Sequence, residues 1–136
     1  VNVIMNLANS QEEAKAYEGF ADTYYSGQKV IYLNLGVDFS APEFQKGLAE
    51  GLRFFAANKG TYYVHCTEGK DRAGFVSALL ECLMGATYDE VVADYMVTYY
   101  NYYGQVRRHC QQQHHQDPPE RLWRGGSVQG RPAEGR

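Results

Sequence analysis

The chain has 136 residues, of which 44% are hydrophobic, and it carries a formal net charge of −3. This length suffices for one domain with a buried core, the acidic balance gives no reason to expect a nucleic-acid partner, and no apolar run is long enough to span a bilayer. The three cysteines are an odd number without regular spacing, which argues against a disulfide framework.

Apolar runs and helical periodicities alternate along most of the chain. Strands are predicted at 1–8, 29–35 and 62–66, and helices at 11–24, 42–57, 72–84 and 88–103. Because strands that alternate with helices form parallel sheets, we expect an α/β fold with a central, mostly parallel sheet and helices on both of its faces. The chain starts at Val1 inside an apparent strand, without an initiator Met, so we also expect N-terminal elements to be missing.

Polar residues mark the helix starts, and apolar spacing marks the buried helix faces. Ser10 is predicted to cap the first helix, and capping-box patterns at 40–43 and 87–90 begin two later ones. The residues predicted to face the core are Phe44, Leu48, Leu52 and Phe55 in one helix and Val91, Val92, Tyr95, Met96 and Tyr99 in the last.

The segment 65–74, His-Cys-Thr-Glu-Gly-Lys-Asp-Arg-Ala-Gly, joins the third predicted strand to the third predicted helix. The start of a helix offers unpaired N–H groups and a positive dipole end, which stabilise an anion. There Cys66 could act as a thiolate nucleophile, and Arg72 could hold two phosphoryl oxygens with its planar fork. Gly69 would let the loop amides turn inward, and His65 is placed to hydrogen-bond the backbone around Cys66. A chain of this length shows the pattern by chance about once in 100,000 cases.

This segment resembles the signature loop of the cysteine-dependent protein tyrosine phosphatase superfamily. Its Gly-Lys-Asp-Arg core at 69–72, together with 85–90 and 94–96, is similar to the bacterial branch that includes lipid-active and dual-specificity members. The resemblance implies a tyrosine-phosphatase-like fold and phosphomonoester hydrolysis through a phosphocysteine, without cofactor or metal. The implied substrates are phosphotyrosine proteins or phosphoinositide-type molecules, including inositol phosphates. Because a working thiolate needs a reducing compartment, the expected localisation is cytoplasmic.

The resemblance also assigns roles within the loop. Cys66 and Arg72 are the expected catalytic residues; the phosphate is expected to bind Thr67, Glu68, Gly69, Lys70, Asp71 and Arg72; and the loop is expected to be supported by His65, Ala73 and Gly74. One position departs from the family, which usually has Ser or Thr directly after the Arg. That hydroxyl bonds the cysteine sulfur and helps it leave, so Ala73 predicts slow breakdown of the phosphoenzyme.

The leaving oxygen needs a general acid, and the sequence leaves more than one candidate. Asp38 follows a predicted strand and lies 28 positions before Cys66, as the acid does in many members of the superfamily. Asp71 lies inside the phosphate loop itself, and Asp22 is a more distant alternative. Asp38 could instead stabilise the dipole of the helix that follows it, and Asp71 could order the loop.

The substrate and the reaction class also keep alternatives. Lys70, a second cation beside Arg72, would favour additional phosphates, whereas Glu68 opposes them. The main alternative hypothesis is a phosphate-binding pseudophosphatase or inactive fragment without turnover. Ala73 favours it because the usual hydroxyl after the Arg is missing. A third is a redox sensor, since an exposed thiolate oxidises readily. A rhodanese-like sulfurtransferase is disfavoured because its loop spaces Cys and Arg differently.

The composition changes after residue 104. Residues 105–136 contain no Tyr, Phe, Ile or Lys, and all six of their basic residues are Arg. Their Gln, Pro and Gly content predicts disorder, and the abrupt change suggests a non-native end. We therefore expect a catalytic domain at 1–104 and a disordered tail at 105–136. A weak metal site at His109, Cys110, His114 and His115 is disfavoured because the tract has no second ligand pair.

Overall fold

The computed structural model describes residues 1–103. Its elements are β1 (Val3–Asn6), α1 (Gln11–Lys15), the 3₁₀ turns η1 (Phe20–Asp22) and η2 (Tyr24–Gly27), β2 (Lys29–Tyr32), α2 (Pro42–Ala57), β3 (Tyr62–His65), α3 (Arg72–Leu83) and α4 (Tyr88–Tyr103). The three strands form a parallel sheet in the order β2-β1-β3, which confirms the α/β class. Residues 1–98 form one compact unit, and the predicted tail with its histidine tract lies outside the described residues.

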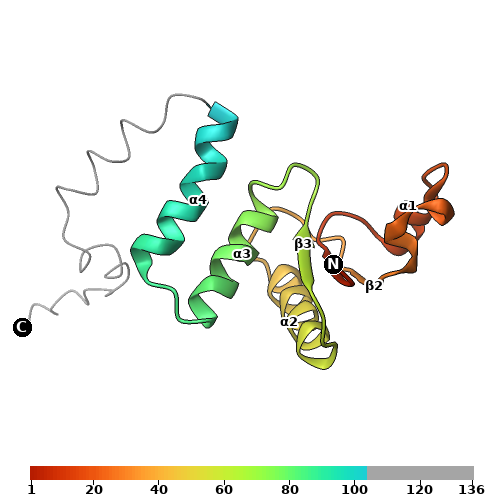
Figure 1. Cartoon of the computed structure of the whole chain (residues 1–136), viewed down its shortest axis with the longest axis horizontal. Helices are drawn as coiled ribbons and strands as arrows, with labels where there is room; N and C mark the ends of the chain where they lie inside the picture. The colour runs from red at the N-terminus through yellow and green to blue at the C-terminus, as the bar shows by residue number, and fades with distance from the viewer. Residues whose placement is uncertain (104–136) are drawn as a thin grey trace, which may run out of the picture. The chain divides into compact units, whose positions relative to one another are not determined.

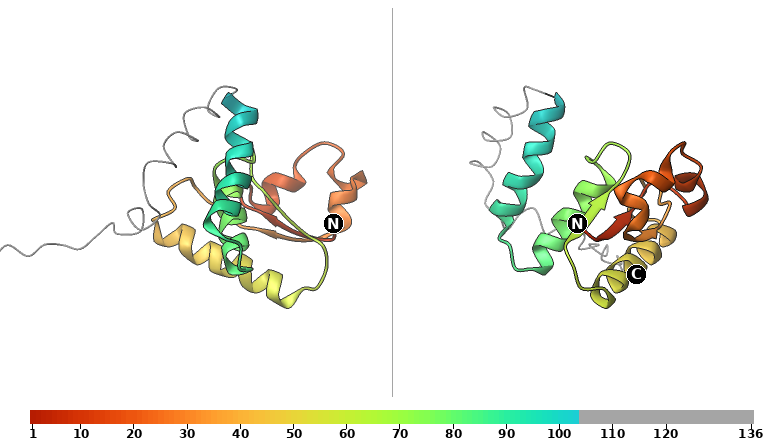
Figure 2. Two further views of the ribbon diagram at one scale, coloured as in Figure 1. Left: turned by 60° about the vertical axis from the view of Figure 1, so that its left-hand side comes forward. Right: turned by 45° about the vertical axis from the view of Figure 1, so that its right-hand side comes forward.

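One face of the sheet carries the apolar core. Successive side chains of a strand point to opposite faces, so Val3 and Met5 lie on the same side of β1, and both are fully buried. The core cluster on this side adds residues of α2, of α3 and of the segments that follow β1 and β2: Leu7, Leu35, Phe44, Phe55, Ala73 and Val76. Both helices are seen beside the strands in Figures 1 and 2.

The opposite face of the sheet carries Ile4 and the buried polar side chain of Asn6. In register beside Asn6 lie Tyr32 of β2 and His65 of β3. Tyr25 of η2 covers this face, since its hydroxyl bonds both Asn6 and His65. Figures 1 and 2 show α1 and the segment after it on the side of the sheet away from α3. Helical segments therefore cover both faces, but they cover them with different chemistry.

Several predicted boundaries are wrong for local reasons. The helix predicted at 11–24 ends at Lys15. The left-handed conformation of Gly19, with φ of 75°, keeps the chain from continuing as one helix, and two 3₁₀ turns follow. The strand predicted at 29–35 ends at Tyr32, because Asn34 has a positive φ of 45° that breaks the extended backbone. The other two strands are also shorter than predicted, as β1 covers only Val3–Asn6 and β3 only Tyr62–His65.

The predicted helix caps have different outcomes. Ser10 and Glu13 form a reciprocal capping box at the start of α1, and Thr87 and Glu90 make the corresponding bonds before α4. The capping box predicted at 40–43 is wrong: α2 has Ala41 at its N-cap position and no side-chain cap. The Ser40 hydroxyl instead donates to the carboxylate of Asp38 at 2.6 Å.

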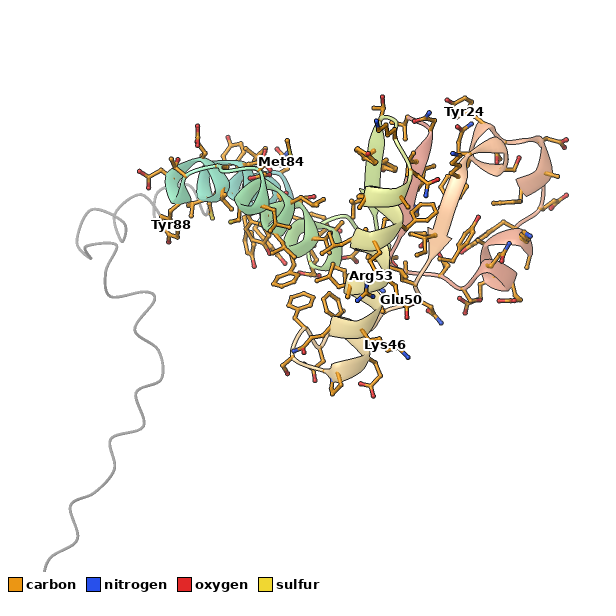
Figure 3. All side chains as sticks on the ribbon, turned by 90° about the horizontal axis from the view of Figure 1, so that it is seen from below. Tyr24, Lys46, Glu50, Arg53, Met84 and Tyr88 are labelled. Carbon is orange, nitrogen blue, oxygen red and sulfur yellow. The ribbon has the colours of Figure 1, made fainter. Side chains whose placement is uncertain are left out.

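The predicted buried face of α2 is confirmed in part. Phe44 and Phe55 are buried as predicted, and the half-buried Leu48 packs against the same core, whereas Leu52 is only half-buried. The other buried residues of α2 are Gly47 and Gly51, which lie between Phe44 and Phe55 in the sequence. A Cβ atom on Gly51 would stand 2.6 Å from the Cε atom of Met5, so the glycine lets α2 approach the sheet closely. Lys46, Glu50 and Arg53, labelled in Figure 3, are exposed on α2.

Candidate active site

Cys66 lies directly after β3, at the carboxyl end of the parallel sheet. The chain runs from β1 to β2 on one side and returns to β3 on the other side, so this end of the sheet is a topological switch point, where open α/β sheets bind ligands. The loop 66–71 then leads into α3, which begins at Arg72. The first N–H groups of that helix have no partner within it, and the loop therefore combines a thiol with an anion-binding helix start.

Glycine sets the curvature of this loop. Gly69 has a φ of 82°, a left-handed conformation that only glycine adopts without strain. In this conformation the Gly69 N–H donates a hydrogen bond to the Cys66 Sγ atom at 3.3 Å. This hydrogen bond holds the sulfur atom on the inner side of the loop, next to the backbone N–H of Gly69.

The Arg72 guanidinium connects two loops at the same end of the sheet. Its Nη1 donates to the carbonyl oxygen of Leu35 at 2.7 Å, and its Nη2 donates to the Thr67 Oγ1 at 3.0 Å. Leu35 lies on the segment after β2, whereas Thr67 lies beside Cys66. A guanidinium has five N–H donors in a planar fork, so these two bonds orient the group and leave donors for an anion.

The charged side chains of the loop pair with one another. The Lys70 Nζ atom lies 3.3 Å from a carboxylate oxygen of Glu68 and 3.7 Å from one of Asp71. Both carboxylates are about half exposed, so the ion pairs are screened by water and contribute little to stability. The ion pairs matter within the loop, where two carboxylates partly neutralise the positive charge of Lys70.

Asp38 and Asp71, two of the three candidate acids, have different surroundings, and the third, Asp22, lies in η1. Asp38 is exposed, and its carboxylate accepts hydrogen bonds from the hydroxyl and the backbone N–H of Ser40. These bonds lower the pKa of Asp38 below its ordinary value, which favours the ionised carboxylate. Asp71 occupies the position before the first residue of α3, without a side-chain cap bond, and pairs with Lys70.

The residues predicted to support the loop lie around its two ends. The His65 Nδ1 atom is 3.4 Å from the carbonyl oxygen of Cys66. Ala73 and Gly74 are buried in the first turn of α3. A Cβ atom on Gly74 would stand 2.8 Å from a ring carbon of Tyr95, so the glycine lets this tyrosine of α4 pack against the helix that begins at the loop.

Two residues of this region were not predicted from the sequence. Asn6 and Tyr25 form hydrogen bonds that reach His65, yet neither lies near the 65–74 motif in the chain. For Asn6 a signal existed, because a lone amide inside the apolar run at 1–8 has to find partners when it is buried. For Tyr25 no comparable signal existed among twelve tyrosines.

Other site types find no support in the described part of the chain. Residues 1–103 contain no group of three or more His, Cys, Asp and Glu side chains that could hold a metal ion. Within the same range, no helix is both long and apolar enough to cross a membrane.

Comparison with protein families gives a match that covers most of the chain. A family model described as the tyrosine phosphatase family matches residues 2–129, which includes the loop and every element of the sheet. No curated protein matches the chain.

Proposed function

The chain belongs to the tyrosine phosphatase family and is a phosphoester hydrolase, and from this premise we propose that it cleaves phosphomonoesters through a phosphocysteine on Cys66. The observation that carries the proposal is the hydrogen bond from the Gly69 N–H to the Cys66 Sγ atom, at the start of a helix and beside Arg72. These groups suit a nucleophile and an oxyanion at the same place.

In the first step, the Cys66 thiolate attacks the phosphorus atom. The S–P bond forms while the P–O bond to the leaving group breaks, and the leaving oxygen takes a proton from a general acid. Arg72 and the loop N–H groups bind the non-bridging oxygens, on which negative charge is concentrated in phosphoryl transfer. The bonds from Arg72 to Leu35 and Thr67 hold the guanidinium in place for this role.

In the second step, water attacks the phosphocysteine. The S–P bond breaks, one proton of the water returns to the general acid, inorganic phosphate leaves, and the sulfur returns as a thiolate to which the Gly69 N–H can donate. Ala73 offers no hydroxyl for this departure, so we expect the second step to limit turnover.

For the general acid we propose Asp38. The carbonyl of Leu35 binds Arg72, and Leu35 lies three residues before Asp38. A short segment therefore links the proposed acid to the arginine that binds the phosphate. Because its bonds to Ser40 lower the pKa of Asp38, the carboxyl has to leave Ser40 to carry a proton. In Asp38→Asn, activity should no longer fall with rising pH, and esters with poor leaving groups should lose more activity than aryl phosphates. The same behaviour in Asp71→Asn instead would move the role to Asp71.

We propose phosphotyrosine in proteins as the substrate class. A phosphoinositide with several phosphates needs additional positive charge, and Lys70 is the loop residue that could supply it. Since Lys70 is paired with Glu68 and Asp71, the two carboxylates offset the benefit of a second phosphate. Turnover of a phosphotyrosine peptide should therefore exceed turnover of an inositol polyphosphate, and the reverse order would assign the lipid-type substrate.

The direct test is phosphate release from a small aryl phosphate by the full chain and by Cys66→Ser. We expect at least a 10³-fold loss, on the order seen when a catalytic nucleophile is removed. Cys82→Ser is the matched control, because Cys82 is exposed on α3 and its loss should leave turnover unchanged. Equal activity of Cys66→Ser and the parent chain would refute the mechanism.

One observation favours a second function, a phosphate-binding module without turnover: Ala73 stands where the family usually has a hydroxyl. The two functions differ in rapid-mixing experiments, because an enzyme limited by its second step releases a burst of the aryl alcohol. Ala73→Ser should then raise the steady rate about 2- to 10-fold, the worth of one hydrogen bond. Phosphate binding without any burst would assign the binding module.

A further inference from the structure

A chain of hydrogen bonds runs from the middle strand of the sheet to the candidate nucleophile. The Asn6 amide lies 3.3 Å from the Tyr25 hydroxyl, which lies 2.9 Å from the His65 Nε2 atom. On the other side of the same ring, Nδ1 lies 3.4 Å from the carbonyl oxygen of Cys66. Asn6 is only 2% exposed, so the chain starts inside the protein and ends at the loop.

The backbone determines how the Asn6 amide is oriented. Its Oδ1 atom accepts hydrogen bonds from the N–H groups of Ala8 and Asn9, at 2.9 and 3.1 Å. Backbone N–H groups can only donate, so the oxygen has to be on their side and the NH₂ group on the side of Tyr25. The amide therefore donates to the Tyr25 hydroxyl oxygen.

The direction of the next two bonds follows from the carbonyl of Cys66. A carbonyl oxygen can only accept, so contact with His65 requires a proton on Nδ1. In a neutral imidazole Nε2 is then an acceptor, and it receives the hydrogen of the Tyr25 hydroxyl. With the opposite tautomer, the bare Nδ1 atom and the carbonyl oxygen of Cys66 would face each other without a hydrogen.

We propose that Asn6 and Tyr25 are positioning residues, which hold His65 as its neutral Nδ1–H tautomer and thereby orient the carbonyl of Cys66 at the start of the phosphate-binding loop. The effect on catalysis rests on the proposed function of Cys66 as the nucleophile. In a trans peptide the carbonyl and the following N–H point in opposite directions. A carbonyl held toward His65 therefore turns the Thr67 N–H the other way.

We call the hydrogen-bonded chain Asn6–Tyr25–His65 the relay. Its surroundings keep the imidazole of His65 neutral and the hydroxyl of Tyr25 protonated. Burial lowers the pKa of His65 below its ordinary value, and burial raises the pKa of Tyr25 to about 12. Titratable neighbours on this face are Tyr32 of β2 and Tyr63 of β3, whose ring stacks on His65 at 5.5 Å. The imidazole thus stays neutral and the phenol keeps its proton across the neutral range.

The first test reads the tautomer without any need for turnover. Long-range ¹H–¹⁵N correlation spectra of the full chain at pH 7, with His65→Gln to assign the signal, report which ring nitrogen carries the proton. We expect a protonated Nδ1 and an unprotonated Nε2. A proton on Nε2 would overturn the proposal, whether or not the chain is an active phosphatase.

The second test removes the Tyr25 hydroxyl and keeps its ring. In Tyr25→Phe we expect mixed His65 tautomers and a slower alkylation of Cys66 by iodoacetamide, measured on the Cys66 peptide. We also expect kcat/KM for an aryl phosphate to fall about 2- to 10-fold, the worth of one hydrogen bond. Tyr32→Phe is the matched control, because Tyr32 lies in register beside Asn6 on the same face. The wild-type tautomer and alkylation rate in Tyr25→Phe would contradict the proposal.

The two tests separate failure of the proposed function from failure of the relay. If the parent chain releases no phosphate, the proposed function fails, while the tautomer and the alkylation rate still decide whether the relay exists. If the parent chain is active and Tyr25→Phe matches it in all three measurements, the relay fails and the function stands.

Discussion

The two faces of the sheet use the same strands for different purposes. Met5 and Asn6 are neighbours in β1, but Met5 packs into the apolar core under α2, whereas Asn6 begins a hydrogen-bond chain that ends at Cys66. Burial of apolar area stabilises the fold without direction, while hydrogen bonds hold particular atoms in particular orientations. The comparison suggests that the apolar face determines whether the domain folds and the polar face determines how its loop is set.

The apolar face should give the largest effect, and on stability alone. Met5 is fully buried, so Met5→Ala should lower the free energy of unfolding by about 2–5 kcal/mol through lost burial and a remaining cavity. Met84 is 87% exposed at the end of α3, labelled in Figure 3, and Met84→Ala should stay within about 0.5 kcal/mol of the parent. Urea unfolding measures both variants.

For this comparison to hold, the folded fraction of Met5→Ala has to keep the parent kcat. A cost below about 1 kcal/mol for Met5→Ala, or a changed kcat in the folded protein, would remove the distinction between the two faces.

Arg72 lies at the carboxyl end of the sheet, where it connects the segment after β2 to the phosphate-binding loop. Its replacement should affect activity rather than stability. Lys cannot reproduce the fork that binds Leu35 and Thr67. Arg72→Lys should lower kcat/KM about 10²-fold, near the lower limit for removing a transition-state donor. Arg53→Lys, at an exposed position on α2, serves as the control and should match the parent. An Arg72→Lys variant with the kcat/KM of the parent would show that the planar fork of Arg72 is not needed.

The smallest expected effect belongs to the polar face of the sheet. It is a dependence of the free energy of unfolding on pH. Burial lowers the pKa of His65 in the folded state below its ordinary value of 6.5. As the pH falls through about 6.5, the unfolded chain takes up this proton first, so stability present above that pH is progressively lost toward the folded-state pKa. Urea unfolding between pH 7.5 and 5 should show this loss in the parent and a reduced loss in His65→Gln. Parallel curves for the two proteins would contradict the assignment.

Much of the candidate site could be predicted because its signal is local. Between His65 and Gly74 the residue types, the glycine and the helix start follow one another in the chain, and the left-handed conformation of Gly69 is a property of that residue. The α/β class followed from the alternation of apolar runs with helical periodicity. The ends of elements were less predictable, because they depend on single backbone conformations such as the positive φ of Asn34, two residues after β2 ends.

The sequence by itself therefore determined the position of the loop, the residue types that it carries and the class of the fold, all of which depend on neighbours in the chain. Only the tertiary structure decided which distant groups meet that loop. The bonds from Asn6 to Tyr25, from Tyr25 to His65 and from Arg72 to Leu35 join residues 19 to 40 positions apart. Parallel pairing sets Asn6 in register beside His65, whereas Tyr25, Leu35 and Arg72 lie outside the strands and reach their partners through the packing of the folded chain. A hydrogen bond forms only where that packing brings donor and acceptor within about 3 Å.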